Sequence, residues 1–107
     1  MKKFKAFVAL DAPNNRKNIE IVRKLNKFVY GFKVGYRSFY NKDADKLISE
    51  IKRNNSSLFL DLKLHDIPNT VSSAIESLKK INPDFLTLHI TGGTEMIKSA
   101  LKNIKKF

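Results

Sequence analysis

Four short apolar segments alternate with four amphipathic segments along this chain, and this alternation constrains its fold most strongly. Each apolar segment carries a phenylalanine, and successive phenylalanines are 25, 27 and 26 residues apart, at Phe7, Phe32, Phe59 and Phe85. We interpret these segments as strands; they span 7–10, 28–35, 59–64 and 85–90. Short apolar strands that alternate with amphipathic helices predict a parallel sheet with helical crossovers.

In the amphipathic segments, apolar residues recur every three or four positions, which is typical of helices that bury one side. The expected apolar stripes are Ile19, Val22 and Leu25; Ala44, Leu47, Ile48 and Ile51; Val71, Ala74, Ile75, Leu78 and Ile81; and Ile97, Ala100, Leu101 and Ile104. Asp43 and Thr94 are predicted to cap the second and fourth helices, and Pro68 suits the first turn of the third. Residues 36–42 are predicted to form a loop.

Both doubly wound sheets and (β/α)8 barrels begin with such units. The first turn, Asp11-Ala12-Pro13, lacks the glycine-rich fingerprint of a dinucleotide-binding fold. Charged residues instead lie at or near the carboxyl ends of the predicted strands, where barrels build their active sites. We therefore predict an α/β fold in which residues 1–107 are a single partial domain. Its four parallel βα units would be the N-terminal half of a TIM (β/α)8 barrel, which typically needs about 250 residues.

The composition is strongly basic, with a formal net charge of +11, and contains no cysteine, which excludes disulfides and thiolate metal sites. The densest group of lysines is predicted to lie on a solvated helix face and comprises Lys98, Lys102, Lys105 and Lys106. No aromatic residues are interleaved with it, so a base-stacking platform is not expected. A basic nucleic-acid-binding module is an alternative, but it leaves the charged strand ends unexplained.

A cytoplasmic protein without a membrane partner is the expectation. No apolar run approaches membrane-spanning length. The apolar run that follows the basic first residues ends at Asp11 and is too short for a signal peptide.

Four charged residues of alternating sign stand out near the second and third strands: Lys33, Asp61, Lys63 and Asp66. Asp61 and Lys63 are two apart in a strand, so they should project side by side, roughly 6–7 Å apart at the backbone. A lysine flanked by carboxylates is held protonated and is a proton donor rather than a nucleophile. Such an arrangement suits loss of CO2 followed by protonation of carbon; a structural ion-pair network lining a barrel explains the charges equally well.

The stretch from Asp61 to Thr70 reads Asp-x-Lys-x-x-Asp followed by Ile-Pro-Asn-Thr. Three shorter motifs stand at the other strands: Ala9-Leu10-Asp11, Phe32-Lys33-Val34-Gly35 and Leu88-His89-x-x-Gly92-Gly93. In this order and at consecutive strand ends, the four motifs resemble those of the orotidine 5'-phosphate decarboxylase family. The resemblance covers essentially the whole chain, but only the N-terminal half of a family member.

The resemblance implies conversion of orotidine 5'-phosphate to UMP in pyrimidine synthesis, without a metal or organic cofactor. Lys63 is similar to the lysine that protonates C6 of the pyrimidine, and Asp61 resembles the carboxylate placed against the departing carboxylate. Lys33 resembles the lysine that holds this aspartate and reaches the ribose hydroxyls. Asp11 resembles a residue that binds the nucleoside.

Asp66 and Thr70 resemble residues that reach across a homodimer interface into the partner's site. The family's phosphate-binding residues and its closing loop would lie in the half that the resemblance does not cover. We therefore expect this chain to be inactive or weak alone. Two other readings stay open: a related sugar-phosphate enzyme such as hexulose-phosphate synthase, which uses a metal, and an inactive half-barrel fragment.

Overall fold

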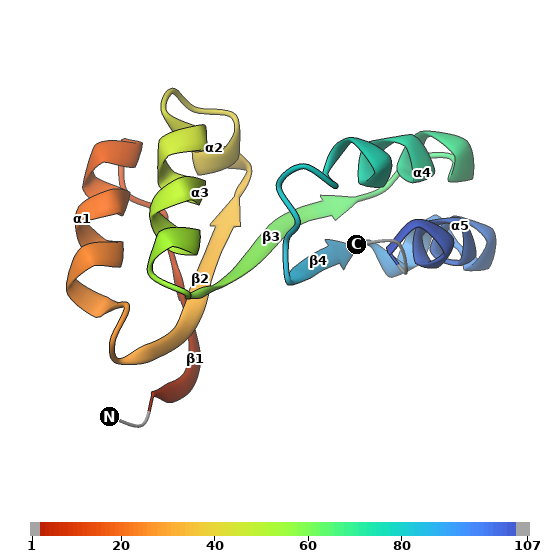
Figure 1. The fold of residues 1–107 in the computed structure, drawn as a ribbon. Helices are drawn as coiled ribbons and strands as arrows, with labels where there is room; N and C mark the ends of the chain where they lie inside the picture. The colour runs from red at the N-terminus through yellow and green to blue at the C-terminus, as the bar shows by residue number, and fades with distance from the viewer. Residues whose placement is uncertain (1–2, 105–107) are drawn as a thin grey trace.

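The computed structural model describes residues 3–104 (Figure 1). In chain order, its elements are β1 (Phe4–Ala9), α1 (Asn15–Leu25), β2 (Val29–Gly35), α2 (Tyr36–Phe39), α3 (Ala44–Arg53), β3 (Ser57–Leu64), α4 (Pro68–Ser77), β4 (Phe85–Leu88), the 3-10 helix η1 (Ile90–Gly92) and α5 (Thr94–Ile104). The predicted alternation of strands and helices is confirmed, with α2 and η1 as short additions.

The strands form one parallel sheet in the order β1-β2-β3-β4. Each strand therefore pairs with the one that follows it in the chain. A doubly wound sheet reverses its strand order at a switch point, whereas a barrel adds each strand beside the last. The unbroken order among the described strands is that of consecutive barrel units.

One face of the sheet packs against helices. Phe32 and Val34 of β2 and Leu58 and Leu60 of β3 are fully buried there. The apolar stripes of α1 and α3 complete this cluster, and α4 and α5 build a second one around Val71, Ile75, Met96 and Ala100. Figure 1 shows α1 and α3 lying together at one end of the molecule and α4 with α5 at the other.

The opposite face of the sheet carries an aromatic cluster. The ring of Phe7 meets those of Tyr30, Phe59 and Phe85 edge-on, with centroids 5.3–5.4 Å apart. Tyr30 and Phe85 remain nearly half exposed. Phe32 has the same spacing in the sequence as the other strand phenylalanines, but it is buried in the core against the helices. The aromatic residue that β2 contributes to the cluster is Tyr30.

Three local predictions were wrong in whole or in part. Residues 36–39 form the short helix α2 directly after β2, rather than part of a loop. Asp43 occupies the N-cap position of α3 as predicted, but its side chain makes no capping hydrogen bond; its backbone is left-handed, with φ of 65°, and its carboxylate pairs with Lys46. Thr94 is the first residue of α5 rather than a residue preceding it.

Two predicted stripes were partly wrong. The helix α4 ends at Ser77, so Leu78 and Ile81 pack from the turn that follows it. In α5, Met96 is buried and Leu101 is about half exposed, so the buried stripe is shifted from the one predicted.

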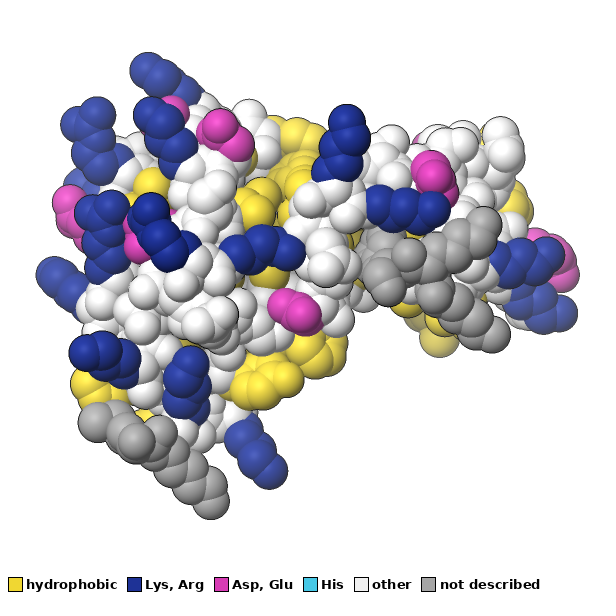
Figure 2. All heavy atoms as spheres, in the orientation of Figure 1, with side chains coloured by type: hydrophobic (Ala, Val, Ile, Leu, Met, Phe, Trp, Pro, Cys, Tyr) yellow, Lys and Arg dark blue, Asp and Glu magenta, His cyan; other side chains and the backbone are white. Residues whose placement is uncertain are grey.

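Lysine and arginine side chains are spread along the molecule, from the α1 and α3 end to the α4 and α5 end (Figure 2). Lys98 and Lys102 are exposed on α5, whereas Lys105 and Lys106 lie outside the described residues. Within residues 3–104, no helix is long and apolar enough to cross a membrane.

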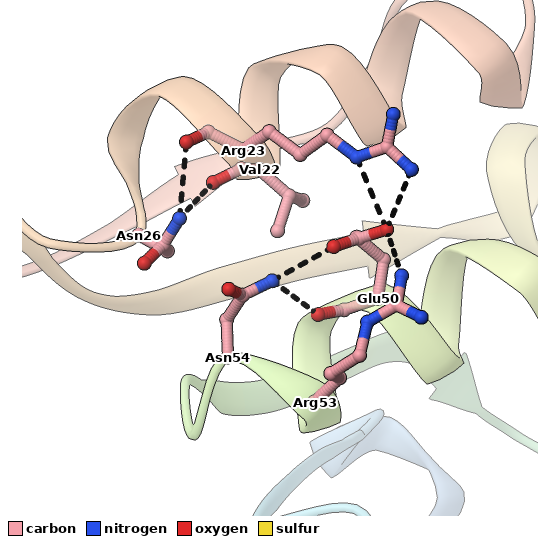
Figure 3. Close-up of polar contacts among 6 residues, drawn as sticks. All are labelled: Val22, Arg23, Asn26, Glu50, Arg53 and Asn54. Carbon is pink, nitrogen blue, oxygen red and sulfur yellow. Dashed lines mark hydrogen bonds and ion pairs between the residues drawn. The ribbon is translucent and has the colours of Figure 1, made fainter.

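A buried carboxylate on α3 forms hydrogen bonds that connect α3 to α1 (Figure 3). The Glu50 side chain is 7% exposed and accepts hydrogen bonds from Arg23 of α1 at 3.1 and 3.2 Å. Arg53 and Asn54 donate to it as well. Burial alone would raise the pKa of Glu50, but the hydrogen bonds from Asn54, Arg23 and Arg53 outweigh burial and lower it.

We expect Glu50→Gln to destabilise the chain by about 1–3 kcal/mol at neutral pH, because charge-assisted hydrogen bonds are lost at a buried position. The pKa of Glu50 is lowered in the fold, so its contribution is present above the unfolded-state pKa and disappears as the pH falls through the folded-state pKa. Urea denaturation at neutral and acid pH measures both effects.

The matched control is Glu20→Gln, an exposed glutamate on α1, the helix that carries Arg23. It should leave the free energy of unfolding within about 0.5 kcal/mol of the wild type. Equal destabilisation by the two variants at every pH would contradict the assignment.

Candidate active site

Asp61 stands at the centre of a charged cluster on the sheet face opposite the helices. Its neighbours Leu60 and Leu62 are buried toward the helices, so alternation along β3 directs Asp61 to the other face. Register places Asp61 beside Gly35 at the carboxyl end of β2. Gly35 has no side chain, and the carboxylate is nevertheless 91% buried by the groups that surround it.

Two ammonium groups flank this carboxylate. Lys33 Nζ lies 3.1 Å from Asp61 Oδ2, and Lys63 Nζ lies 2.8 Å from Oδ1. Burial would raise the pKa of Asp61, but hydrogen bonds from Lys63, Thr87 and Lys33 outweigh burial and lower it to about 2. Asp61 is therefore ionised across the physiological pH range.

Lys63 is the most accessible member of the cluster, with 52% of its side chain exposed. The hydrogen bond to Asp61 raises the pKa of Lys63, and the charges of Asp61, Tyr36 and Asp11 act in the same direction. Its Nζ also lies 5.8 Å from the centre of the Tyr36 ring. The ammonium is thus held protonated, and half of its side chain is open to a ligand.

The backbone at Lys63 departs from a regular strand. Its φ of 49° is in the left-handed region, which costs a non-glycine residue roughly 1–2 kcal/mol. The pairing of β3 with β4 shifts at the same place: Leu60 pairs with Leu86 and Leu64 with Leu88, so β3 carries two extra residues. The end of β3 that bears the lysine is therefore bulged and held by contacts other than the regular ladder.

Thr87 on β4 is the residue that sequence reasoning missed. Its hydroxyl donates to Asp61 Oδ1 at 2.9 Å and accepts from the backbone N–H of Lys63 at 2.9 Å. A threonine within an apolar strand carries no distinctive signal, since Thr is a common strand residue. Side chains alternate along a strand, so Thr87 faces the same side of the sheet as Phe85. This alternation is the one sequence signal that could have placed Thr87 on the face that carries Asp61.

Asp11 belongs to a loop that a buried polar network holds in place. Asn18 Oδ1 accepts from the Ala12 N–H, and Asn18 Nδ2 donates to Asn15 and Ser38. The Ser38 hydroxyl donates to the Leu10 carbonyl at 2.5 Å. These side chains fix the turn between β1 and α1. The carboxylate of Asp11 is exposed and lies close enough to Lys63 to contribute to its raised pKa.

Asp66 and Thr70 lie beside this cluster rather than in it. Asp66 is exposed, and its carboxylate accepts a hydrogen bond from the following Ile67 N–H at 2.7 Å. Among the ion pairs of residues 3–104, none involves Asp66. Thr70 lies on α4 and lines a hollow of about 240 Å³ together with Lys63 and Asp66. Of the four charged residues that alternate in sign in the sequence, three form ion pairs with one another: Lys33, Asp61 and Lys63.

Two histidines follow the carboxyl ends of β3 and β4 and contact each other. The rings of His65 and His89 stack with centroids 4.6 Å apart, and Thr91 Oγ1 lies 2.6 Å from His89 Nδ1. A side chain at Gly92 would have to displace the end of the Met96 side chain and would crowd His65. In the described part of the chain, no group of three or more His, Asp or Glu residues is arranged to hold a metal ion.

The cluster combines an ionised carboxylate with an accessible proton donor. A ligand carboxylate placed against Asp61 would be repelled and would gain from losing its charge. The adjacent Lys63 ammonium could then protonate the carbon that the departing group leaves. Lys33 neutralises part of the charge of Asp61 and is 34% exposed, so it can also donate to a ligand hydroxyl.

The chain matches the family model described as "Orotidine 5'-phosphate decarboxylase / HUMPS family" over residues 5–107. It is 46% identical over 100 residues to orotidine 5'-phosphate decarboxylase of Fusobacterium nucleatum, with 94% of this chain and 41% of that protein covered. It is 44% identical over 93 residues to the protein of the same name from Carboxydothermus hydrogenoformans, with 87% and 38% covered.

Among solved structures, the chain is similar to orotidine 5'-monophosphate decarboxylase from Methanocaldococcus jannaschii complexed with inhibitor BMP. The TM-score is 0.87 at 27% identity, with 98% of this chain and 49% of that chain covered. The chain thus spans two fifths to one half of the length of these relatives. The predicted fold class, parallel βα units amounting to half of a TIM barrel, is confirmed.

We expect Lys63→Ala to raise the pKa of Asp61 from about 2 toward the usual value near 4, because the nearest donor to the carboxylate is removed. The folded-state pKa lies below the unfolded one, so ionised Asp61 stabilises the fold at neutral pH. This contribution is lost between about pH 4 and pH 2. Titration of the carboxyl carbon by NMR measures the pKa directly.

Lys79→Ala serves as the control, because Lys79 pairs with Glu76 and is not part of the cluster. It should leave the titration of Asp61 unchanged. A wild-type Asp61 that titrates near its usual value would show that the two lysines do not hold it as described.

Proposed function

Because the chain belongs to the orotidine 5'-phosphate decarboxylase / HUMPS family, we propose that it contributes the charged half of a site that converts orotidine 5'-phosphate to UMP. The observation that carries this proposal is the Asp61 carboxylate held ionised between Lys33 and the exposed ammonium of Lys63. The reaction would serve de novo pyrimidine biosynthesis in the cytoplasm.

Asp61 and Lys63 divide the chemistry between them. The substrate carboxylate would lie against Asp61, where like charge disfavours the ground state more than the transition state. The bond from C6 to the carboxylate carbon breaks, CO2 leaves, and the electron pair stays on C6. A proton from Lys63 Nζ then forms the new C6–H bond. Solvent can reprotonate Lys63, since half of its side chain is exposed.

The other predicted residues would bind the substrate. Lys33 would hold Asp61 and reach the ribose hydroxyls, and Asp11, in its anchored loop, would bind the nucleoside. No metal or organic cofactor takes part in this proposal. Barrels often bind phosphate with loops after strands seven and eight, which correspond to no segment of the four units described. Remote phosphate contacts supply binding energy to the reacting centre, so we propose that the chain alone is inactive or weak.

The test joins this chain to the part of the Fusobacterium nucleatum relative that it does not match. We expect the joined protein to form UMP from orotidine 5'-phosphate, and Lys63→Ala to lower kcat by at least about 10²-fold, since a positioned proton donor typically contributes about 10²–10⁴-fold. Spectrophotometry of orotidine 5'-phosphate consumption measures the rate.

Lys79→Ala in the same joined protein should retain full activity. A folded joined protein without activity, or one in which Lys63→Ala is harmless, would refute the proposal. Activity toward sugar phosphates that depends on an added divalent metal would point to the related sugar-phosphate enzymes instead.

We further propose a homodimer in which Asp66 and Thr70 act in the partner's site. Both lie outside the ion-pair cluster of their own chain, and Asp66 is exposed with one local hydrogen bond. Its carboxylate is therefore available to a second protomer.

If Asp66 acts across the interface, Asp66→Asn and Lys63→Ala should each inactivate the joined protein by itself. Mixed dimers should recover up to about a quarter of wild-type activity, because a random mixture restores one complete site in half of the dimers. Activity of mixtures prepared by refolding the two variants together measures the recovery. Failure of every ratio to exceed the separate variants would place Asp66 in its own chain's site.

A further inference from the structure

We propose that Thr87 is a positioning residue whose hydroxyl sets both the backbone of Lys63 and the carboxylate of Asp61. The inference deepens the proposed function, since it concerns the site assigned to proton transfer. It rests on two contacts of one side chain: Thr87 Oγ1 lies 2.9 Å from the Lys63 backbone N and 2.9 Å from Asp61 Oδ1.

The two contacts fix which way the hydroxyl donates and where it accepts. The Lys63 N–H can only donate, so Thr87 Oγ1 accepts there and turns its own proton to Asp61. An ionised carboxylate can only accept, which fixes the direction of the second bond. One oxygen thereby joins the backbone of the lysine to the side chain of the aspartate.

The irregular pairing of β3 with β4 explains why a side chain is needed here. Between Leu60 and Leu64, the strand β3 has two residues more than β4 opposite it, so the ladder is interrupted. The N–H of Lys63 falls within this interruption, and the Thr87 hydroxyl takes the place of a ladder carbonyl. The regular pattern resumes where the His89 N–H donates to the Leu64 carbonyl at 3.0 Å.

The left-handed backbone of Lys63 gives this contact a functional consequence. At φ of 49°, the lysine side chain leaves the strand in a direction that an extended residue would not provide. From there its ammonium meets Asp61 Oδ1, the same oxygen that accepts from Thr87. Loss of the hydroxyl would release the N–H, free one acceptor site on Asp61, and allow the strand end to relax toward the extended form.

The test compares Thr87→Val with Thr87→Ser in the full 107-residue chain. Valine has nearly the shape of threonine but no hydroxyl, and serine retains the hydroxyl. In Thr87→Val we expect the pKa of Asp61 to rise by roughly one pH unit, as one hydrogen bond to the charged form is lost. We also expect the amide-to-α-proton coupling of Lys63 to move toward the extended value, and Thr87→Ser to restore both readings.

Thr91→Val is the control, because its hydroxyl lies at the same end of the sheet but contacts His89. It should change neither reading. Unchanged Asp61 titration and Lys63 coupling in Thr87→Val would overturn the inference, as would a serine variant that behaves like valine. If Thr87→Val does not fold, Thr87→Ala, which also lacks the hydroxyl, is measured in its place. A raised pKa of Asp61 in Thr87→Ala supports the inference, and an unchanged pKa overturns it.

The Asp61 titration and the Lys63 coupling are both measured without substrate. If neither changes in Thr87→Val while the joined protein still forms UMP, Thr87 is not the positioning residue but the proposed function stands. Conversely, both readings can respond as expected in a protein whose joined form has no decarboxylase activity.

Discussion

A carboxylate buried at the end of a parallel strand requires compensating donors, and the surroundings of Asp61 are organised by this requirement. An isolated buried charge is costly, whereas one that is paired and hydrogen-bonded is tolerated. The compensation comes from three strands: Lys33 from β2, Lys63 from β3 and Thr87 from β4. Strand order and register are therefore as necessary to this charge as the residues themselves.

The two faces of the sheet differ in the side chains that they carry. Toward the helices, alternate strand residues such as Phe32 and Leu60 are fully buried in an apolar core. On the other face, edge-on aromatic rings around Phe7 give way to the Asp61 cluster farther along the strands. In the barrels to which this chain is similar, that face corresponds to the interior, which agrees with the half-exposed rings of Tyr30 and Phe85.

The bulged end of β3 holds the proposed proton donor, Lys63, in a strained backbone conformation. Lys63 adopts a left-handed backbone that a lysine would not choose in isolation, and the surrounding contacts must maintain it. The hydroxyl of Thr87 and the carboxylate of Asp61 are the contacts that the structure provides. A proton donor held in this way is aimed before a substrate arrives, which is the general value of preorganised sites.

Much of the arrangement was predictable because it depends on local order in the chain. Hydrophobic periodicity predicted the four βα units, and the two-residue spacing of Asp61 and Lys63 predicted that they meet. Local signals failed where another contact competed for the residue. Asp43 was expected to cap α3, but its carboxylate pairs with Lys46 and its backbone is left-handed. Asp66 forms a hydrogen bond with the next backbone N–H and no ion pair among residues 3–104, and its role in a partner's site stays a prediction.

By itself, the sequence determined the parallel α/β class and the charged residues that the strands present, because periodicity and spacing act within a few residues of the chain. Only the tertiary structure decided that Thr87 joins the cluster, that Tyr30 rather than Phe32 completes the aromatic face, and that Lys63 is left-handed. Each of these depends on the register between neighbouring strands. Register is a relation between segments some 25 residues apart, and no local pattern specifies it to the single residue.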